Sequence, residues 1–262
     1  MSEDLLLSTK DGIATVTLNR PDQRNAMNFA MWRDLGRVCR NLDADPNVRV
    51  VLLTGAGDDA FSAGADIKEF DDHRSNSAQA LEWAGAIDEA LDGLESLTKP
   101  TISLIKGYCV GGGCELACFA DLRISADNAR FGVPAARLGI SIGHKEMRRL
   151  IQLVGPGNTN YILLSARLMD AQEALRIGLV NQVVPLAEID EYTSKLASGI
   201  ASLAPLSHQD NKEIARTVLA NPGLQRLTPD QQALPYRVFD SEDYQEGRRA
   251  FLEKRRPNFH GR

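Results

Sequence analysis

Three consecutive glycines, Gly111–Gly113, constrain the fold of this chain more than any other feature. They follow a short apolar run, Pro100–Lys106, typical of a buried strand, and they precede an apolar stretch, Cys114–Ala120, typical of a helix. Glycines at such a junction leave backbone N–H groups exposed at a helix N-terminus, which attracts negative charge. Glu115 lies three residues after Gly112, so the two share one helix face if Gly112 is already in the first turn. The pattern predicts an oxyanion donor and a proton-moving carboxylate in one cavity, although an acid at a helix start is also favoured by the dipole alone.

A second segment of small residues, FSAGADIK at 61–68, follows an apolar run at Val48–Thr54 that predicts a buried strand. The loop after a strand is where open α/β sheets place ligands. Small side chains let a substrate approach the backbone closely, so we interpret this segment as a second candidate for substrate contact. A flexible turn of small residues is the alternative interpretation.

Strands alternate with helices over residues 1–185, which predicts an α/β core domain. A loop is expected from Gly55 through Ala65, and a mostly helical chain with one short strand near Leu179–Val184 is expected beyond residue 145. Residues 186–262 are predicted to form a helical C-terminal region that acts as a lid, an oligomerisation element or both. The further expected strands are Leu5–Thr9, Gly12–Leu18 and Leu122–Ser125, and the further expected helices are Met27–Leu42 and Ala78–Leu97.

The composition of the 262 residues, 43% hydrophobic and 25% charged, is that of an ordinary globular protein. A net charge of −5 disfavours a nucleic-acid partner, and no apolar run reaches the roughly 18 residues of a membrane span. The acidic start, MSEDLLLSTKDG, lacks the basic-then-apolar order of a signal peptide, so we expect a cytoplasmic location. The four cysteines and four histidines show no metal-ligand spacing, and we expect no metal site.

Two short motifs point to other enzyme classes, and their surroundings disfavour both. Gly55–Ala60 fits the GxGxxG/A dinucleotide pattern, but a poor helix start follows it and no acidic residue ends a second strand about 20 positions on. Gly139–Gly143 fits the GxSxG pattern around Ser141, but the residues before it make a poor strand, which a nucleophile elbow requires. We therefore disfavour a Rossmann site and a serine hydrolase.

Five segments in order resemble the enoyl-CoA hydratase/isomerase (crotonase) family, and the resemblance covers nearly the whole chain. It implies a crotonase-like spiral of ββα units with a helical C-terminal region, assembled as a homotrimer or hexamer. It implies an acyl-CoA thioester substrate and no separate cofactor, because coenzyme A is part of the substrate. The five segments are LNRPDQRNAM (18–27), FSAGADIKEF (61–70), GYCVGGGCELACFADLRIS (107–125), LVGPGNTNYILLSARLMDAQEALRIGLVNQVVP (153–185) and FLEKRRPNFHGR (251–262).

The resemblance also implies the site residues. The N–H groups of Ala65 and Gly112 would grip the thioester oxygen, and Glu115 would position water or move a proton. Phe251 and Lys254 match tail positions that often contact CoA, sometimes from a neighbouring subunit. The other implied substrate and CoA positions are Arg24, Ala26, Ala63, Asp66, Ile67, Lys68, Gly111, Pro134, Ala135, Gly143 and His144.

One position departs from the family pattern. Hydratases that this chain resembles use two glutamates, and the second is expected directly after Phe131–Pro134, where this chain has Ala135. We expect hydration of 2-enoyl-CoA, with Glu115 alone or with His144 or Glu146 in place of the second glutamate. The alternatives are another reaction of the family, namely isomerisation, decarboxylation or thioester hydrolysis, and an acyl-CoA-binding paralogue with little turnover.

Overall fold

The computed structural model of this chain describes residues 3–262, and six strands form its larger sheet, in the order β1-β2-β3-β5-β7-β10. The β1–β2 hairpin is antiparallel and turns at Asp11 and Gly12, both with positive φ; every other pairing in this sheet is parallel. The hairpin expected from the sequence is confirmed. The strands are β1 (Leu5–Lys10), β2 (Ile13–Leu18), β3 (Val50–Gly55), β5 (Thr101–Ile105), β7 (Leu122–Ala126) and β10 (Gln182–Val184).

A smaller sheet contains the strands that directly follow β3, β5 and β7 along the chain. Its order is β4-β6-β8-β9, with β4 (Ala60–Ser62), β6 (Tyr108–Val110), β8 (Arg130–Gly132) and β9 (Met169–Asp170). The chain thus passes from the larger sheet to the smaller one and then into a helix, three times in succession. The predicted α/β fold built as a spiral of ββα units is confirmed.

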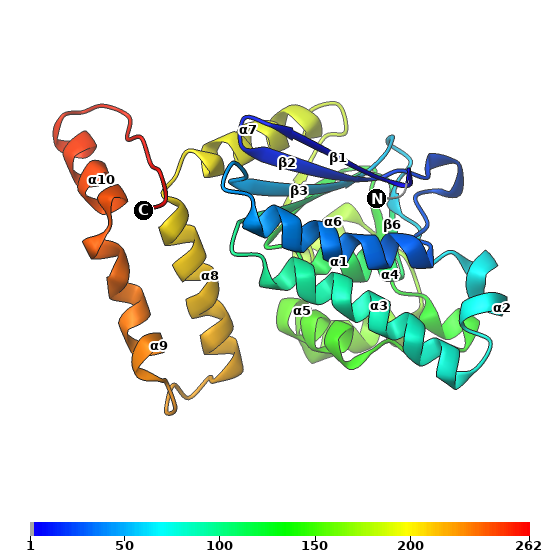
Figure 1. Cartoon of the computed structure of the whole chain (residues 1–262). Coiled ribbons are helices and arrows are strands. Elements are labelled where there is room, and N and C mark those ends of the chain that lie inside the picture. The colour runs from blue at the N-terminus through cyan, green and yellow to red at the C-terminus, as the bar shows by residue number, and fades with distance from the viewer. Residues whose placement is uncertain (1–2) are drawn as a thin grey trace.

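Two helices cross closely on one side of the larger sheet, α1 (Phe29–Ala44) and α3 (Ser77–Ser96) (Figure 1). Gly36 of α1 and Gly93 of α3 make this approach possible. A Cβ on Gly93 would lie 3.3 Å from the Cα of Gly36, and one on Gly36 would lie 3.0 Å from the backbone oxygen of Glu89. The crossing fixes the positions of the side chains that α1 and α3 present to the site described below.

The remaining helices connect the strands and form the C-terminal part of the chain. α5 is kinked at Gly155, whose φ of 75° and ψ of 164° are not helical, directly before Pro156. These helices are α2 (Phe70–His73), α4 (Gly112–Cys118), α5 (His144–Ser165), α6 (Ala171–Arg176), α7 (Ile189–Ala201), α8 (Pro205–Ala220), α9 (Pro229–Ala233) and α10 (Glu242–Leu252), with 3-10 turns η1 (Pro21–Gln23), η2 (Ile67–Glu69), η3 (Ala135–Leu138) and η4 (Leu234–Asp240).

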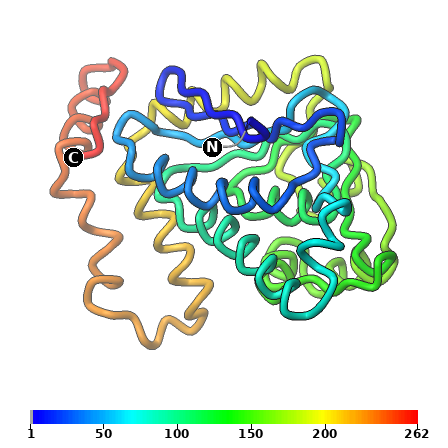
Figure 2. The backbone as a smooth tube through the Cα atoms, turned by 45° about the vertical axis from the view of Figure 1, so that its right-hand side comes forward, coloured from blue at the N-terminus to red at the C-terminus, as the bar shows by residue number. Residues whose placement is uncertain are grey.

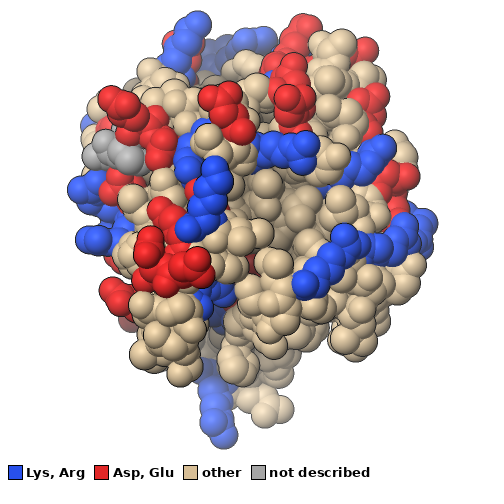
Figure 3. Space-filling view, turned by 90° about the vertical axis from the view of Figure 1, so that its right-hand side faces the viewer, with Lys and Arg blue, Asp and Glu red and all other residues tan. Residues whose placement is uncertain are grey.

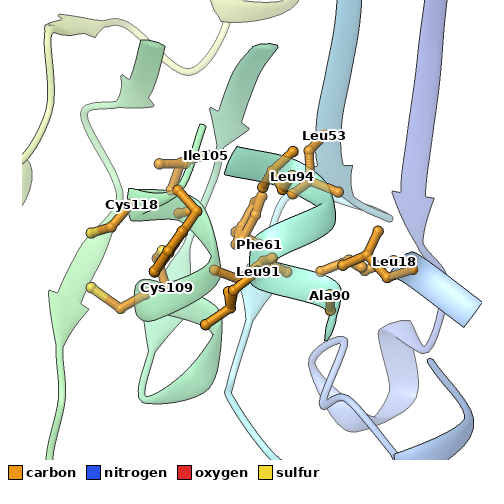
Figure 4. Close-up of a cluster of buried hydrophobic side chains, with 14 of the residues drawn as sticks. Leu18, Leu53, Phe61, Ala90, Leu91, Leu94, Ile105, Cys109 and Cys118 are labelled. Atoms are coloured by element: carbon orange, nitrogen blue, oxygen red, sulfur yellow. The ribbon is translucent and has the colours of Figure 1, made fainter. Parts of the chain in front are cut away.

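The main hydrophobic core lies where the two sheets meet α3 and α4. Figure 4 shows Phe61 of β4 and Leu91 and Leu94 of α3 at its centre, between side chains from β2 and β3 on one side and Cys109 and Cys118 on the other. All four cysteines are buried and free. A second apolar cluster joins the larger sheet to α7, so that helix belongs with the sheet although it follows residue 185.

The last three helices extend from the body as an arm, with α9 and α10 standing apart from the sheets (Figures 1 and 2). Two cations of α8 hold the base of the arm. Lys212 donates to the backbone oxygen of Lys99 and to Asp121, and Arg216 donates to the backbone oxygens of Glu95 and Leu97. The division of the chain into domains at residue 185 stays a prediction.

Several predicted boundaries were wrong. The helix expected from Met27 begins at Phe29, because the side chain of Asn28 accepts from the N–H of Met31 and caps the helix there. The loop expected over Gly55–Ala65 contains β4, the helix expected over Cys114–Ala120 starts two residues earlier, at Gly112, and the strand expected over Leu179–Val184 is shorter, Gln182–Val184. β4 and β6 have three residues each, too few for a period-two pattern to be visible.

We expect Gly107→Ala to destabilise the fold by about 2–4 kcal/mol, because Gly107 has a φ of +58° and an added Cβ would lie 1.9 Å from the backbone oxygen of Asp59. The control is Gly85→Ala in the middle of α3, where a Cβ would meet nothing within 4 Å. That change should be neutral or stabilise by up to about 1 kcal/mol. Urea midpoints measure both, and equal midpoints for the two variants would contradict the prediction.

Candidate active site

A cavity of about 620 Å3 lies between α1, α3, the start of α4 and the start of α5. Both small-residue segments of the sequence form part of its wall: Ala63, Gly64 and Ala65 from one, Gly111 and Gly112 from the other. Figure 3 views the molecule from the side of α2 and shows a hollow with mainly uncharged walls and with lysine and arginine side chains around it. The structure therefore brings the two segments to one cavity, although Ala65 and Gly111 are 46 positions apart in the sequence.

The N–H group of Ala65 is held in place by its neighbours and has no acceptor of its own. The N–H of Met27 donates to the oxygen of Gly64 at 2.7 Å, and the N–H of Asp66 donates to the oxygen of Met27 at 2.9 Å. These two bonds fix the peptide units on both sides of Ala65. Among residues 3–262, no backbone or side-chain group accepts from the Ala65 N–H.

The N–H group of Gly112 is the other unpaired donor. Gly111 precedes it with a φ of 54° and a ψ of −130°, a conformation that only glycine adopts readily. Gly112 is the first residue of α4, so its N–H has no partner within the helix, and no other described residue accepts from it. A Cβ built on Gly112 would lie 3.7 Å from the nitrogen of Ala65, which places the two donors side by side.

A buried polar network fastens the Ala63–Asp66 segment. Arg20 pairs with Asp66 at 2.8 Å and donates to the backbone oxygen of Ala26. The Ser62 hydroxyl donates to the backbone oxygen of Asn25 and accepts from the N–H of Gly64. Because these groups are largely buried and paired with one another, the donor at Ala65 is held rigidly.

Two carboxyl groups interact across the cavity, Glu115 of α4 and Glu146 of α5. The pKa of Glu115 is raised to about 8, first by burial and then by the negative charge of Glu146, while the positive charge of Arg74 acts in the opposite direction. Burial also raises the pKa of Glu146, whose side chain is 7% exposed and whose Oε2 has no hydrogen-bond partner. At neutral pH such a pair holds a proton on one carboxyl and a charge on the other, so it can both donate and accept.

The cavity collects most, but not all, of the residues predicted from the sequence. Phe251 and Lys254 lie on the arm or just after it and line no part of this cavity, so their contact with CoA stays a prediction. The other residues that do not line it are Arg24, Ala26, Asp66 and Lys68. The predicted residues that do line it are Ala63, Ala65, Ile67, Gly111, Gly112, Glu115, Pro134, Ala135, Gly143 and His144.

Several lining residues were not identified individually from the sequence: Trp32 of α1, Phe70 of α2, Arg74 after it, and Trp83 and Ile87 of α3. They come from helices whose apolar residues are expected to face the core in any fold. The one available signal was the i, i+4 spacing of Trp83 and Ile87, which indicates a shared helix face but not that the face borders a cavity.

The two disfavoured motifs do not form their sites. Gly55–Ala60 leads into β4 instead of a helix, which a dinucleotide site would require. Ser141 borders the cavity but follows η3 and a loop, not a strand. Among residues 3–262, no three His, Cys, Asp or Glu side chains are grouped as a metal site, and no helix is long and apolar enough to cross a membrane.

Comparison with known proteins gives one consistent result. The enoyl-CoA hydratase/isomerase family model matches residues 8–262. A crotonyl-CoA hydratase of Syntrophomonas wolfei is 36% identical over 98% of both chains, and a carnitinyl-CoA dehydratase of Proteus mirabilis is 37% identical over 100% of both. The crystal structure of an enoyl-CoA hydratase/carnithine racemase from Magnetospirillum magneticum has a TM-score of 0.96 at 39% identity, covering 100% of this chain and 97% of that one. An enoyl-CoA hydratase from Bacillus anthracis has a TM-score of 0.89 at 32% identity, covering 99% and 100%.

We expect Glu115→Gln to stabilise the protein at high pH. The folded pKa of Glu115, about 8, lies above its ordinary value of 4.5, so the wild type loses stability as pH rises from 4.5 through 8. The variant lacks this loss. Its gain in unfolding free energy over the wild type should therefore be small at pH 5 and reach about 1–3 kcal/mol above pH 8. This range is lower than the full pKa shift would give, because Glu115 borders the cavity and solvent there screens part of the effect. Urea unfolding at the two pH values measures it, and a difference that does not change with pH would contradict the raised pKa.

Proposed function

The chain belongs to the enoyl-CoA hydratase/isomerase family, and from that premise we propose that its cavity catalyses the reversible addition of water to 2-enoyl-CoA thioesters. One observation carries the proposal: two unpaired backbone N–H groups, at Ala65 and Gly112, lie side by side next to Glu115. Donors held in this way stabilise an oxygen on which negative charge develops, typically by about 3–4 kcal/mol for each donor. A thioester oxygen between them becomes enolate-like, which makes Cβ electrophilic and Cα basic.

The carboxyl pair supplies the proton movements. Glu115, with its pKa near 8, carries the proton at neutral pH, and Glu146 carries the charge. Water attacks Cβ and gives its proton to Glu146 while the electron pair of the double bond moves towards the thioester oxygen. The enolate then takes the proton of Glu115 at Cα, and the negative charge ends on the carboxylate pair. Glu146 thus takes the place of the glutamate that is absent at Ala135.

The residues predicted to contact the substrate would hold its coenzyme A part. The proposed reaction needs no other cofactor. Ala63, Ile67 and Gly111 line the cavity wall. Lys68 and Arg24 are exposed cations on nearby segments that suit phosphate groups, and the Arg24 guanidinium lies 4.9 Å from the centre of the Tyr108 ring.

A homotrimer or hexamer would give Phe251 and Lys254 a role. Phe251 is 84% exposed and does not border the cavity of its own chain. Further large apolar side chains are exposed along the arm, which is typical of a surface that contacts another subunit. They include Leu219, Leu224, Tyr236, Phe239 and Leu252. We also propose a cytoplasmic location, which is consistent with four buried cysteines that are all free.

We expect Glu115→Gln to lower the turnover of crotonyl-CoA by about 10^2–10^4-fold, because a glutamine cannot donate the proton that Cα needs. Loss of the enoyl-thioester absorbance measures turnover, and titration with butyryl-CoA measures binding, which should change little. The control is Glu82→Gln on the exposed face of α3, outside the cavity, which should keep the wild-type rate. Unchanged turnover in the Glu115 variant would overturn the proposed mechanism.

Glu146 has a distinct pH signature. Wild-type hydration should fall above about pH 8, where Glu115 loses its proton. We expect Glu146→Gln to lower kcat by at least about 10^2-fold and to move the remaining alkaline limb to lower pH, because the variant removes a charge that raises the pKa of Glu115. Adding Ala135→Glu to that variant should restore part of the rate. A Glu146 variant with the wild-type rate and pH profile would show that Glu115 acts without it.

A further inference from the structure

Arg74 is a cation at the cavity wall that forms no salt bridge within the described residues. Its guanidinium lies 4.7 Å from the centre of the Phe70 ring and 5.8 Å from that of Trp83, so it is stacked on the aromatic part of the wall. Within residues 3–262, no carboxylate oxygen lies within 4.0 Å of it, and its side chain donates to no acceptor. An arginine guanidinium has five N–H donors, and in a half-buried arginine these donors normally have acceptors. The guanidinium of Arg74 can therefore donate to an acceptor on a bound ligand.

The other charged groups of the cavity do not compensate Arg74. Lys145, the second cation there, is already paired with Asp88 at 3.6 Å and Asp92 at 2.6 Å. Glu115 is the one carboxyl that interacts electrostatically with Arg74, and its raised pKa keeps it largely protonated at neutral pH. Burial lowers the pKa of Arg74 and Glu115 raises it, and the effect of burial is the larger of the two.

The position of Arg74 indicates which part of a substrate would meet it. Arg74 and Glu115 line the same cavity and interact electrostatically. Because the proposed mechanism places Glu115 beside Cα of the thioester, Arg74 lies on the acyl side of the reacting carbons. The phosphates of coenzyme A are separated from the thioester by the whole pantetheine arm, so they do not reach this point. The anion is therefore on the acyl group, beyond the double bond.

We propose that the cavity selects 2-enoyl-CoA thioesters whose acyl chain ends in a carboxylate, and that Arg74 binds this carboxylate while Phe70 and Trp83 hold the guanidinium in place. This proposal rests on the proposed function, which places the thioester beside Glu115, although its binding test needs no turnover. Phe70 and Trp83 are occupied by the guanidinium, so they are not free to form an aromatic cage for a cationic acyl group.

Binding of saturated thioesters tests the proposal without any turnover. Glutaryl-CoA carries the terminal carboxylate, and 5-methylhexanoyl-CoA replaces its two oxygens with methyl groups. Calorimetry should give the wild type at least about tenfold tighter binding of glutaryl-CoA, and Arg74→Met should remove that preference. The control is Arg33→Met, since Arg33 is also near an aromatic ring, 5.9 Å from the centre of Phe29, but is exposed and outside the cavity. Equal binding of the two ligands by the wild type, or a preference that survives in the Arg74 variant, overturns the proposal.

Kinetics then separates substrate recognition from an effect on Glu115. With glutaconyl-CoA and 5-methyl-2-hexenoyl-CoA as substrates, Arg74→Met should raise KM for the first by at least about tenfold and leave KM for the second unchanged. If Arg74 served only to lower the pKa of Glu115, Arg74→Met would change kcat alike for both substrates, leave both KM values unchanged and move the alkaline limb to higher pH. That result would overturn the proposal. If neither substrate is hydrated while the binding preference holds, the carboxylate site stands and the assigned reaction fails.

Discussion

The close approach of two glycine segments is the constraint on which the site depends. Gly64 has a φ of +100°, and a Cβ there would lie 2.9 Å from the oxygen of Val110 and 3.2 Å from the nitrogen of Gly112. Any larger residue would push the two segments apart and separate the donors at Ala65 and Gly112. The parallel pairing of β4 with β6, and the buried network around Arg20 and Asp66, serve to hold this contact. Oxyanion stabilisation depends on such rigidity, because donors that must move into place lose much of their effect.

Around these donors the cavity combines groups whose charges depend on one another. Glu115 is raised in pKa by burial and by Glu146, and Arg74 acts against both. A carboxylate on the substrate would compensate Arg74 and so remove part of its effect on Glu115, which would favour the protonated form needed to donate at Cα. Substrate recognition and the protonation state of the catalytic acid would then be coupled through one arginine.

Much of the fold could be predicted from local patterns. The strands of the larger sheet are apolar and flanked by turn residues, and the helices α1 and α3 were expected to within about two residues at each end. β4, β6 and β8 were not predicted, because three residues carry no periodicity and their pairing depends on partners far along the chain. The helix expected from Met27 also starts later for a reason that lies far along the chain, because Met27 forms a β-bridge with Ala65.

By itself the sequence determined the α/β class, the two glycine segments, Glu115 and the absence of a carboxylate at Ala135, because each of these is a property of residue type and local order. Only the tertiary structure decided that Glu146 and Arg74 border the same cavity and that Phe251 and Lys254 do not. The reason is physical: a carboxyl or guanidinium acts through distance and burial. Both depend on how the end of α2, α4 and α5 pack together, although Arg74, Glu115 and Glu146 are 31 to 72 positions apart in the chain.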